Sequence, residues 1–334
     1  MSGPLRLGLV GCGAISRWHR QALEEVPDIE IAACIDVDGE RARETARECN
    51  AVGYDSLSAA VSAGGIEAAL VMVPHHLHEP VALEALDAGL HLLLEKPMAP
   101  TPDACERILR AAAAAPGVFM VGENAQYWPE VRIVQDAVRR GVIGDVVTAA
   151  VHLFLPPLPD YYGGEKPWRF DVGRAGGGLS IDTGSHYIRP LRMWLGEITE
   201  VVAAMERPHA AMEGESLARA LFRFESGVVA SFSLLLTTGA IAPQEMFRVT
   251  GTEGELTVGL DVKLYDREHR GGLVLEPEVP QGYMRSYAGQ LRDFAKAARL
   301  GEPLEAGPEV ALGELRTALA MERSAKSGRW EPVW

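Results

Sequence analysis

The stretch that decides the fold is Leu5-Arg6-Leu7-Gly8-Leu9-Val10, which runs directly into Gly11-Cys12-Gly13-Ala14-Ile15-Ser16. The first half predicts a buried strand, and the residues from Ile15 onward predict an amphipathic helix. Two glycines permit a tight turn and a close approach of the backbone to a pyrophosphate, whose charge the start of the helix would stabilise. We therefore predict a dinucleotide-binding turn made of Gly11, Gly13, Ala14 and Ile15.

An acidic residue after the next apolar run supports this interpretation. Asp36 follows the run 29–35, at the place where a carboxylate accepts hydrogen bonds from ribose hydroxyls. The same carboxylate would repel a 2′-phosphate, so the sequence favours NAD over NADP as the cofactor. The alternative is that Gly11 and Gly13 form an ordinary turn and that Asp36 caps the following helix.

The chain alternates strand and helix patterns up to residue 123 and then changes character. The alternation predicts an α/β Rossmann domain, a doubly wound parallel sheet, over residues 1–123. Longer β-branched runs over residues 124–334 predict an α+β domain with a large open, mainly antiparallel sheet. The expected strands are 5–10, 29–35, 68–73, 91–94, 118–121, 146–154, 198–204, 218–224, 228–236, 244–250 and 255–258; the expected helices are 15–25, 39–49, 57–62, 79–88, 102–115, 130–140, 284–300 and 308–327.

Composition excludes several classes of protein. The 334 residues include 32 basic and 46 acidic ones, a net charge of −14 that repels nucleic acids and anionic lipid surfaces. The uncharged stretch 226–244 carries serines, threonines and a proline, so it predicts a strand rather than a membrane span. The four cysteines lack the spacing of a zinc site or a disulfide framework. We therefore expect reduced thiols, no metal, no membrane anchor or signal peptide, and a cytoplasmic protein.

The tripeptide Glu95-Lys96-Pro97 follows the apolar run 91–94. Ligands of open α/β sheets bind at the carboxyl ends of the strands, which is where this run ends. Lysine is scarce here, with five among 32 cations, so a lysine at this place calls for an explanation. A ligand-binding ammonium is one explanation, and an ordinary surface ion pair is the other.

Two further segments contain histidines. In Pro74-His75-His76-Leu77-His78, no acid or cysteine at ligand spacing supports a metal site, so we expect this loop to line the cofactor. In the glycine-rich block 176–186, Asp182 and His186 lie four residues apart, which predicts one helix face. A carboxylate beside an imidazole suits a general base, although a helix cap and a buried core histidine would show the same spacing.

At these residues the chain resembles the Gfo/Idh/MocA family of oxidoreductases, the group that contains glucose-fructose oxidoreductase and inositol dehydrogenases. The resemblance covers nearly the whole chain and is most specific in the Glu-Lys-Pro tripeptide and the Asp182-x-x-x-His186 block. It implies a nicotinamide cofactor, and homodimers or homotetramers that pack the sheets of their second domains together. By this resemblance, the cofactor-binding residues include Pro74, His75, His78, Glu95 and Lys96.

The resemblance also implies an activity, namely oxidation of a secondary carbinol, or reduction of its ketone, on a sugar, cyclitol or sugar derivative. Lys96 and His186 would be the catalytic pair and Asp182 the assisting carboxylate. These roles suit the side chains, because His186 can accept the hydroxyl proton while the Lys96 ammonium stabilises the oxyanion. Two alternatives remain: an NAD-dependent glycosidase that uses transient oxidation and elimination, and a non-catalytic nicotinamide-binding sensor.

The chain departs from the family pattern where the substrate would lie. Arg189 replaces an acidic residue common in the family; close to His186, it could hold an anionic group such as a carboxylate or phosphate. The segment 124–127 is also unusual, and Trp168-Arg169 either lines a pocket or packs a loop. The candidate substrate residues are therefore Asn124, Tyr127, Trp168, Arg169 and Arg189.

Overall fold

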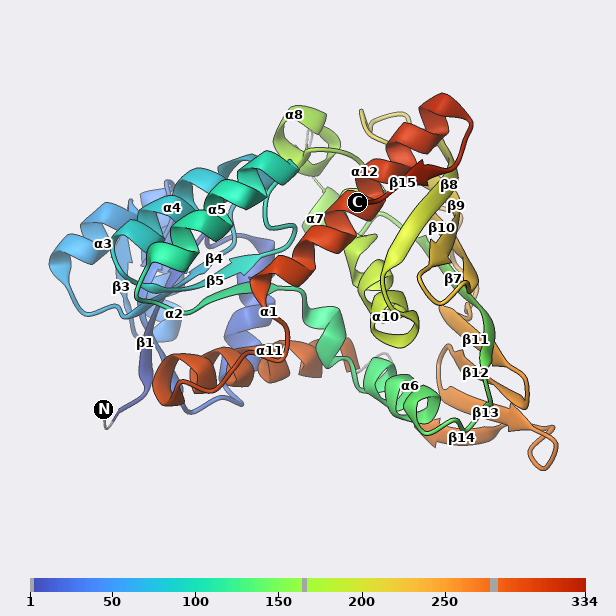
Figure 1. The fold of residues 1–334 in the computed structure, drawn as a ribbon. Coiled ribbons are helices and arrows are strands. Elements are labelled where there is room, and N and C mark those ends of the chain that lie inside the picture. Colours follow the sequence, from blue (N-terminus) through green and yellow to red (C-terminus); the bar gives the residue numbers. More distant parts are fainter. Residues whose placement is uncertain (1–2, 164–166, 277–281) are drawn as a thin grey trace. The chain divides into compact units, whose positions relative to one another are not determined.

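The computed structural model describes residues 3–163, 167–276 and 282–334, and the chain divides into two compact units (Figure 1). The first unit is Met1–Glu123 together with Tyr287–Leu312, and the second is Asn124–Ser286 together with Gly313–Trp334. Residues 287–312 therefore belong to the first unit, which corrects their predicted place in the second domain.

Contacts of helix α11 (Gly282–Leu300) explain this correction. Leu291 and Phe294 of α11 are fully buried. Near the end of the helix, the Arg299 guanidinium donates to both carboxylate oxygens of Glu67, at 3.0 and 2.6 Å. A late helix thus completes the first unit through contacts between residues more than 200 positions apart, which local periodicity does not reveal.

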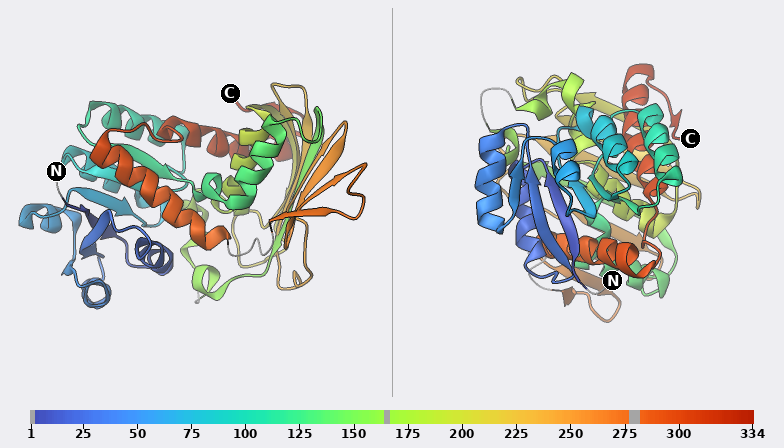
Figure 2. Two further views of the ribbon diagram at one scale, coloured as in Figure 1. Left: turned by 90° about the horizontal axis from the view of Figure 1, so that it is seen from below. Right: turned by 90° about the vertical axis from the view of Figure 1, so that its left-hand side faces the viewer.

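The first unit is built on a parallel sheet with strand order β3-β2-β1-β4-β5-β6. This confirms the predicted doubly wound sheet. The sheet reverses its order between β1 and β4, where such folds bind ligands. Helices cover both faces (Figure 2), which explains the nearly continuous burial of β4 and β5. The strands are β1 (Leu5–Val10), β2 (Ile29–Ile35), β3 (Val52–Tyr54), β4 (Ala68–Val71), β5 (His91–Glu95) and β6 (Phe119–Gly122).

The helices of the first unit begin where the sequence supplies caps. The Asp38 carboxylate accepts from the backbone N–H groups of the first turn of α2, and the Ser56 and Thr101 hydroxyls do the same for α3 and α5. The short strand β3 was not predicted, because three residues carry too little periodicity. Besides α11, the helices are α1 (Ala14–Leu23), α2 (Gly39–Cys49), α3 (Leu57–Ala63), α4 (His78–Asp87) and α5 (Pro102–Ala114), with the short η1 (His75–Leu77) and η5 (Pro308–Val310).

The second unit is built on a nine-stranded sheet with order β14-β13-β12-β11-β7-β10-β9-β8-β15. The sheet is mainly antiparallel, as predicted, and mixed, because β7 and β10 pair in parallel. Strands β13 to β15 were not predicted. The strands are β7 (Val146–Leu155), β8 (Ile198–Glu206), β9 (Leu217–Phe224), β10 (Val229–Leu236), β11 (Phe247–Gly251), β12 (Gly254–Val258), β13 (Val262–Asp266), β14 (Leu273–Glu276) and β15 (Glu331–Pro332).

One face of this sheet packs against helices to form the core of the second unit. Phe222 of β9 and Phe232 of β10 are fully buried, with ring centroids 4.8 Å apart. Trp194 joins two of the covering helices, since its Nε1 donates to the carbonyl of Val131 at 3.0 Å. The helices are α6 (Pro129–Arg139), α7 (Pro159–Tyr162), α8 (Val172–Ala175), α9 (Leu179–Asp182), α10 (Ser185–Leu195) and α12 (Ala311–Ser327), with η2 (Asn124–Tyr127) and η3 (Trp168–Phe170).

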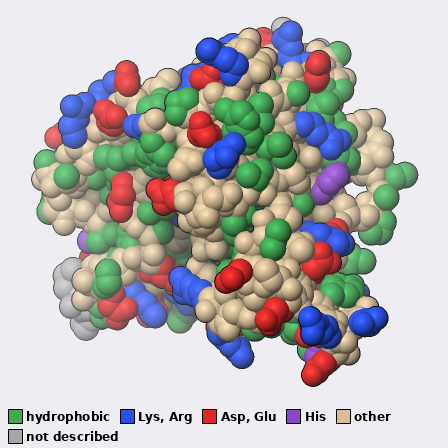
Figure 3. Space-filling model, turned by 45° about the vertical axis from the view of Figure 1, so that its right-hand side comes forward, with side chains coloured by type: hydrophobic (Ala, Val, Ile, Leu, Met, Phe, Trp, Pro, Cys, Tyr) green, Lys and Arg blue, Asp and Glu red, His purple; other side chains and the backbone are tan. Residues whose placement is uncertain are grey.

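Two properties of the structure concern membrane spans and nucleic-acid binding, which the composition argued against. None of the helices in the described residues combines the length and the apolarity that crossing a bilayer requires. On the face drawn in Figure 3, acidic and basic side chains are interspersed rather than sorted into separate areas. Such a distribution lacks the focused positive field that attracts nucleic acids.

Candidate functional site

The glycine turn after β1 forms a cradle for a dinucleotide phosphate. Gly11 has φ +95°, and a Cβ there would lie 2.5 Å from the carbonyl oxygen of Met72, so only glycine fits. Helix α1 begins at Ala14 after Gly13, which has no side chain to cap it and open space where a Cβ would stand. The Ser16 N–H donates to the Gly13 carbonyl at 3.1 Å, which leaves the N–H groups of Ala14 and Ile15 to face an anion, and the cradle fits a pyrophosphate.

Asp36 lies beside this turn at the end of β2. Its Oδ2 accepts from the backbone N–H of Cys12 and its Oδ1 from that of Asp38, each at 2.9 Å. The Arg41 guanidinium approaches both oxygens, at 3.4 and 3.5 Å. The carboxylate is therefore held at the position where a ribose would bind, with a cation next to it.

Lys96 directly follows β5, and buried polar groups support its loop. Glu95 Oε1 lies 2.6 Å from His19 Nε2, and Glu95 Oε2 accepts from the backbone N–H of Lys96 at 3.2 Å. Both His19 and Glu95 are buried, and the Lys96–Pro97 peptide bond is cis. Sequence reasoning missed His19, whose only signal is a polar residue on the buried face of α1.

His78 joins the loops that follow β4 and β5. Its Nδ1 lies 2.7 Å from the carbonyl oxygen of Pro97, and its Nε2 lies 2.9 Å from that of Val73. Burial lowers the pKa of His78. Both ring nitrogens face protein carbonyls, so the ring braces two loops of the predicted cofactor site. His75 is also buried, with its ring 5.4 Å from that of His78.

Possible metal ligands do not gather in the described residues: no group of three or more His, Cys, Asp or Glu side chains there is arranged to hold an ion.

The sequence predicted that Asp182 and His186 lie on one helix. In the structure of the second unit they lie on two helices. Helix α9 ends at Asp182 and α10 begins at Ser185. Between them Gly184 packs tightly, since a Cβ there would lie 2.3 Å from the carbonyl oxygen of Ser180. His186 therefore occupies the first turn of α10, where it is 9% exposed and its ring centroid lies 6.0 Å from that of Trp128.

Asp182 is the centre of a polar cluster at the end of α9. Its Oδ2 accepts from Arg169 Nε at 3.1 Å and lies 3.5 Å from the Tyr162 hydroxyl. The Arg169 guanidinium also stacks on Trp168, 4.3 Å from the ring centroid. Burial and the Asp182 charge raise the pKa of Tyr162, which keeps its hydroxyl protonated. The predicted residues Asp182, Arg169 and Trp168 are thus in contact.

The remaining candidate substrate residues are buried by protein contacts. Asn124 is fully buried, and its Nδ2 donates to the Ser286 hydroxyl at 2.9 Å. Tyr127 is 6% exposed, with the Arg132 guanidinium 5.2 Å from its ring centroid.

Arg189 is committed to a buried ion pair, which corrects its predicted role in holding an anionic substrate. Its Nε and Nη2 donate to the two carboxylate oxygens of Glu314, both at 2.9 Å, and its Nη1 donates to Gln126 Oε1. Both charged side chains are only 4% exposed. Arg192 also pairs with Glu314, and it pairs with Glu197 as well. The network joins α10 to α12.

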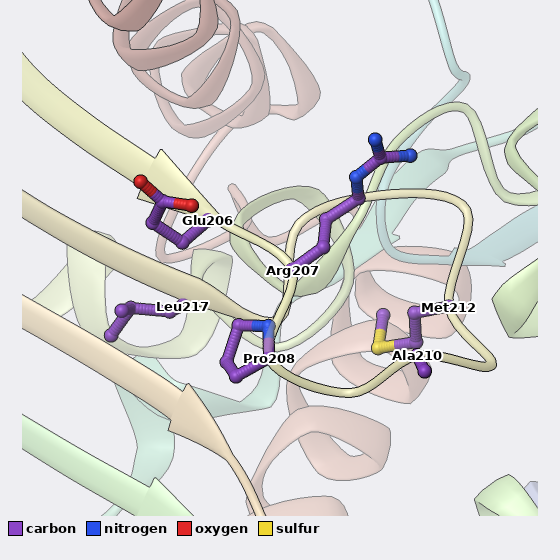
Figure 4. A pocket seen from close by; sticks show the side chains of 6 residues that line it. All are labelled: Glu206, Arg207, Pro208, Ala210, Met212 and Leu217. Atoms are coloured by element: carbon purple, nitrogen blue, oxygen red, sulfur yellow. The ribbon is translucent and has the colours of Figure 1, made fainter.

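A cavity of about 620 Å³ opens beside the connection between β8 and β9 (Figure 4). Glu206 and Leu217 belong to the strands, and the connecting loop supplies the rest of the lining. None of the predicted site residues lines this cavity. The lining residues are Glu206, Arg207, Pro208, Ala210, Met212 and Leu217.

Comparison with known proteins identifies two matching family models. Residues 5–123 match the model described as "Oxidoreductase family, NAD-binding Rossmann fold", and residues 131–257 match the GFO/IDH/MocA C-terminal domain. The chain is similar to 1,5-anhydro-D-fructose reductase of Ensifer adhaerens, with 30% identity over 97% of both chains. It is also similar to D-apiose dehydrogenase of Paraburkholderia graminis, with 28% identity over 77% of this chain and 68% of the relative.

Solved structures show the same fold. An oxidoreductase from Thermotoga maritima has a TM-score of 0.87 and 26% identity, covering 99% of this chain and 98% of its own. The WlbA dehydrogenase from Bordetella pertussis, solved with NADH and UDP-GlcNAcA, also has a TM-score of 0.87, with 24% identity and the same coverage.

Removing Glu314 should destabilise the second unit without altering the predicted catalytic residues Lys96, Asp182 and His186. We expect Glu314→Ala to lower the free energy of unfolding by about 3–5 kcal/mol, because the Arg189 charge remains buried without its partner. Urea unfolding measures the change. The matched control is Glu322→Ala, which removes an exposed ion pair with Lys326 and should change stability by less than about 0.5 kcal/mol. Equal stability of the two variants would contradict a structural role for Glu314.

Proposed function

Because this chain belongs to the Gfo/Idh/MocA family of oxidoreductases, we propose that Lys96 and His186 form its catalytic pair, with Asp182 as the assisting carboxylate. The protein is an NAD(P)-dependent oxidoreductase that acts on a secondary alcohol or ketone of a sugar or cyclitol. The observation that carries the proposal is the position of Lys96. It follows β5 at the sheet edge where β1 ends in the glycine turn.

The residues of the first unit fit a nicotinamide dinucleotide. Gly11, Gly13, Ala14 and Ile15 would hold its pyrophosphate, and Asp36 would accept hydrogen bonds from its ribose. When bound, the nicotinamide ring supplies the hydride acceptor or donor. Pro74, His75 and the Glu95-Lys96 pair are proposed to shape the loops around that ring.

Residues of the chain then transfer the proton of the substrate hydroxyl and stabilise the charge on its oxygen. In the oxidation direction, the His186 imidazole accepts the proton of the substrate hydroxyl, and the Lys96 ammonium stabilises the negative charge on the oxygen. Asp182, held by Arg169, supports the positive charge that develops on His186. In the reduction direction, His186 returns the proton to the same oxygen.

A neutral sugar or sugar derivative is the proposed substrate class. Support comes from the relatives, which are named for 1,5-anhydro-D-fructose and D-apiose. Trp168 is partly exposed and offers an aromatic face of the kind that packs on sugar rings, whereas Asn124 and Tyr127 are buried by protein contacts. We propose that Trp168 and Arg169 border the substrate and that Asn124 and Tyr127 support the site from the protein interior. Arg189, on which the expectation of an anionic substrate rested, is engaged by Glu314.

Alanine variants of the catalytic pair test the proposed chemistry. Lys96→Ala and His186→Ala should each lower kcat by at least about 100-fold, because they remove oxyanion stabilisation and proton transfer. NADH absorbance over a panel of sugars, cyclitols, uronates and nucleotide sugars measures the rates. Lys263→Ala, which alters a surface pair with Asp261, is the matched control and should keep wild-type activity.

Full activity of either catalytic variant would refute the assignment. The same assay separates the alternatives, because a dehydrogenase accumulates NADH, whereas an NAD-dependent glycosidase regenerates its cofactor in each cycle.

For the cofactor, we propose NAD rather than NADP, because Asp36 would repel a 2′-phosphate. Wild-type protein should bind NADH at least 10-fold more tightly than NADPH, on the order of 1.4 kcal/mol. Asp36→Ala should largely abolish this preference, since it removes the repelling carboxylate and leaves Arg41, still paired with Asp38, beside the 2′ position. Adding Arg41→Ala should remove the gain in NADPH affinity. Fluorescence titration measures both affinities, and tighter NADPH binding by the wild type would overturn the proposal.

We also propose that two copies of the chain associate through the outer face of the second unit's sheet. The register places Val202, Leu221, Ser231 and Ala150 side by side on β8, β9, β10 and β7. Small and apolar residues thus form the centre of this row, and Leu221 is 42% exposed. A partly exposed row of small and apolar residues on a sheet fits a surface that a second copy covers.

A charge in that row should dissociate the oligomer. Leu221→Arg should convert a dimer or tetramer to monomers at micromolar concentration, because pairing two copies would bury like charges. Light scattering after size-exclusion chromatography measures the mass. Ile241→Arg is the control, since Ile241 is 88% exposed in a loop outside the sheet. A monomeric wild-type protein would end the proposal.

A cytoplasmic location is proposed from the cysteines. All four are free thiols. Reducing compartments keep thiols in this state, whereas oxidising compartments favour disulfides.

A further inference from the structure

The connection between β8 and β9 (residues 207–216) contacts the first two residues of α9. Glu215 Oε1 accepts from the backbone N–H of Ser180 at 2.7 Å, and the Glu215 carbonyl oxygen accepts from that of Leu179 at 2.9 Å. Leu179 and Ser180 are each 1% exposed, so their N–H groups need partners within the protein. Gly178, which precedes the helix, has no side chain to supply one. Glu215 therefore anchors a segment that lies 35 positions away along the chain.

Two glycines allow this contact. A Cβ at Gly178 would lie 2.3 Å from both the carbonyl oxygen and Oε2 of Glu215, and a Cβ at Gly214 would lie 2.6 Å from the Cα of Gly178. The two backbones thus pass each other where a side chain on either glycine would separate them. On the other side of Glu215, Ser216 is fully buried, and its carbonyl oxygen accepts from the N–H of Leu236 in β10 at 2.8 Å. The sheet therefore fixes the place from which Glu215 reaches α9.

The anchored turn carries Asp182 and leads to His186. A helix of four residues, such as α9, is not stable on its own, because it closes very few hydrogen bonds. The Thr183 N–H donates to the carbonyl of Leu179 at 2.9 Å, and the His186 N–H donates to that of Thr183 at 3.3 Å. Backbone hydrogen bonds thus lead from Leu179, which Glu215 holds, to His186. The position of Asp182 at the end of the turn depends on the same contacts.

The same connection also holds the partner of Asp182. Arg169, which donates to Asp182 Oδ2, belongs to η3. The carbonyl oxygen of Phe170, the next residue, accepts from the Glu213 N–H at 2.9 Å, and Glu213 Oε2 accepts from the Val172 N–H at 3.2 Å. The connection therefore contacts the backbone beside both members of the Arg169–Asp182 ion pair.

We propose that Glu215 is a positioning residue for Asp182 and that it acts through Asp182 on proton transfer at His186. The inference rests on the roles proposed above for Asp182 and His186. By holding the Ser180 N–H, the Glu215 side chain keeps the end of α9 where Asp182 pairs with Arg169. The role requires an acceptor oxygen at the end of a side chain of this length. Glutamine can supply it, whereas aspartate is one methylene group shorter and alanine leaves a buried N–H without its acceptor.

Hydrogen exchange of the full-length protein, measured by mass spectrometry, tests the contact without a substrate. In Glu215→Ala and Glu215→Asp, peptides that cover residues 179–186 should exchange at least about fivefold faster than in the wild type, because the turn loses its anchor. Glu215→Gln should exchange as the wild type does. Should the alanine variant not fold, the aspartate and glutamine variants give the same comparison. Unchanged exchange in Glu215→Asp and Glu215→Ala would overturn the proposal.

The matched control is Glu206→Ala. Glu206 is an exposed carboxylate at the end of β8, where its side chain lines the cavity (Figure 4). Alanine keeps the Glu206 carbonyl oxygen, which accepts from the Ser216 N–H at 3.0 Å. This variant should therefore match the wild type in both exchange and activity.

Steady-state rates with NAD and the most active sugar of the panel separate positioning from a purely structural role. Glu215→Ala should lower kcat at least about fivefold while KM for the sugar changes less than about twofold, and Glu215→Gln should keep kcat within about twofold of the wild type. Adding Glu215→Ala to Asp182→Ala should cause little further loss, because Glu215 acts through Asp182.

The outcomes distinguish this inference from the proposed function. If Asp182→Ala loses activity but Glu215→Ala keeps the wild-type kcat, the inference is wrong and the role of Asp182 stands. If Asp182→Ala keeps the wild-type kcat, both are wrong. Independent, additive losses in the double variant would mean that Glu215 does not act through Asp182, and would also refute the inference.

Discussion

The close approach of Gly11 to the neighbouring strand is the constraint on which the cofactor site depends. The Gly11 N–H donates to the carbonyl of Ile35 at 2.8 Å, and the Met72 N–H donates to that of Val10 at 2.7 Å. The turn is thus tied to β2 on one side and to β4 on the other. Any side chain at Gly11 would push these strands apart, because it would meet the backbone of Met72. The start of α1 and the position of Asp36 both follow from this one contact.

Buried polar contacts hold the loops that follow β4 and β5 at the same edge of the sheet. His19 with Glu95, and His78 with two carbonyls, are almost completely removed from solvent. Burying such groups without hydrogen bonds is unfavourable, so the bond between His19 Nε2 and Glu95 Oε1 and the carbonyl contacts of His78 hold their loops in one arrangement. Lys96 directly follows Glu95, so the hydrogen bonds of Glu95 also fix the backbone at Lys96. The chemistry proposed for Lys96 therefore rests on residues that are themselves remote from a substrate.

The second unit contains two arginine–carboxylate pairs that have different roles. Arg169 pairs with Asp182 in the polar cluster at the end of α9, where aromatic side chains surround the pair. Arg189 pairs with Glu314 between two helices of the core. Burial distinguishes the two arginines: the Arg189 guanidinium is 4% exposed and already donates to Glu314 and Gln126, so it supports the fold rather than a ligand.

The sequence by itself determined the fold class and the turn that binds the dinucleotide. Periodicity, glycine spacing and the acid at position 36 are local patterns, and they also located most strands and helices within a few residues. The short strands and the place of residues 287–312 were not predictable, because they depend on contacts between distant segments. Only the tertiary structure decided that Arg189 is paired with Glu314 and that His78 braces two loops. Burial and partner choice are set by packing between elements far apart in the chain, and local sequence carries no record of that packing.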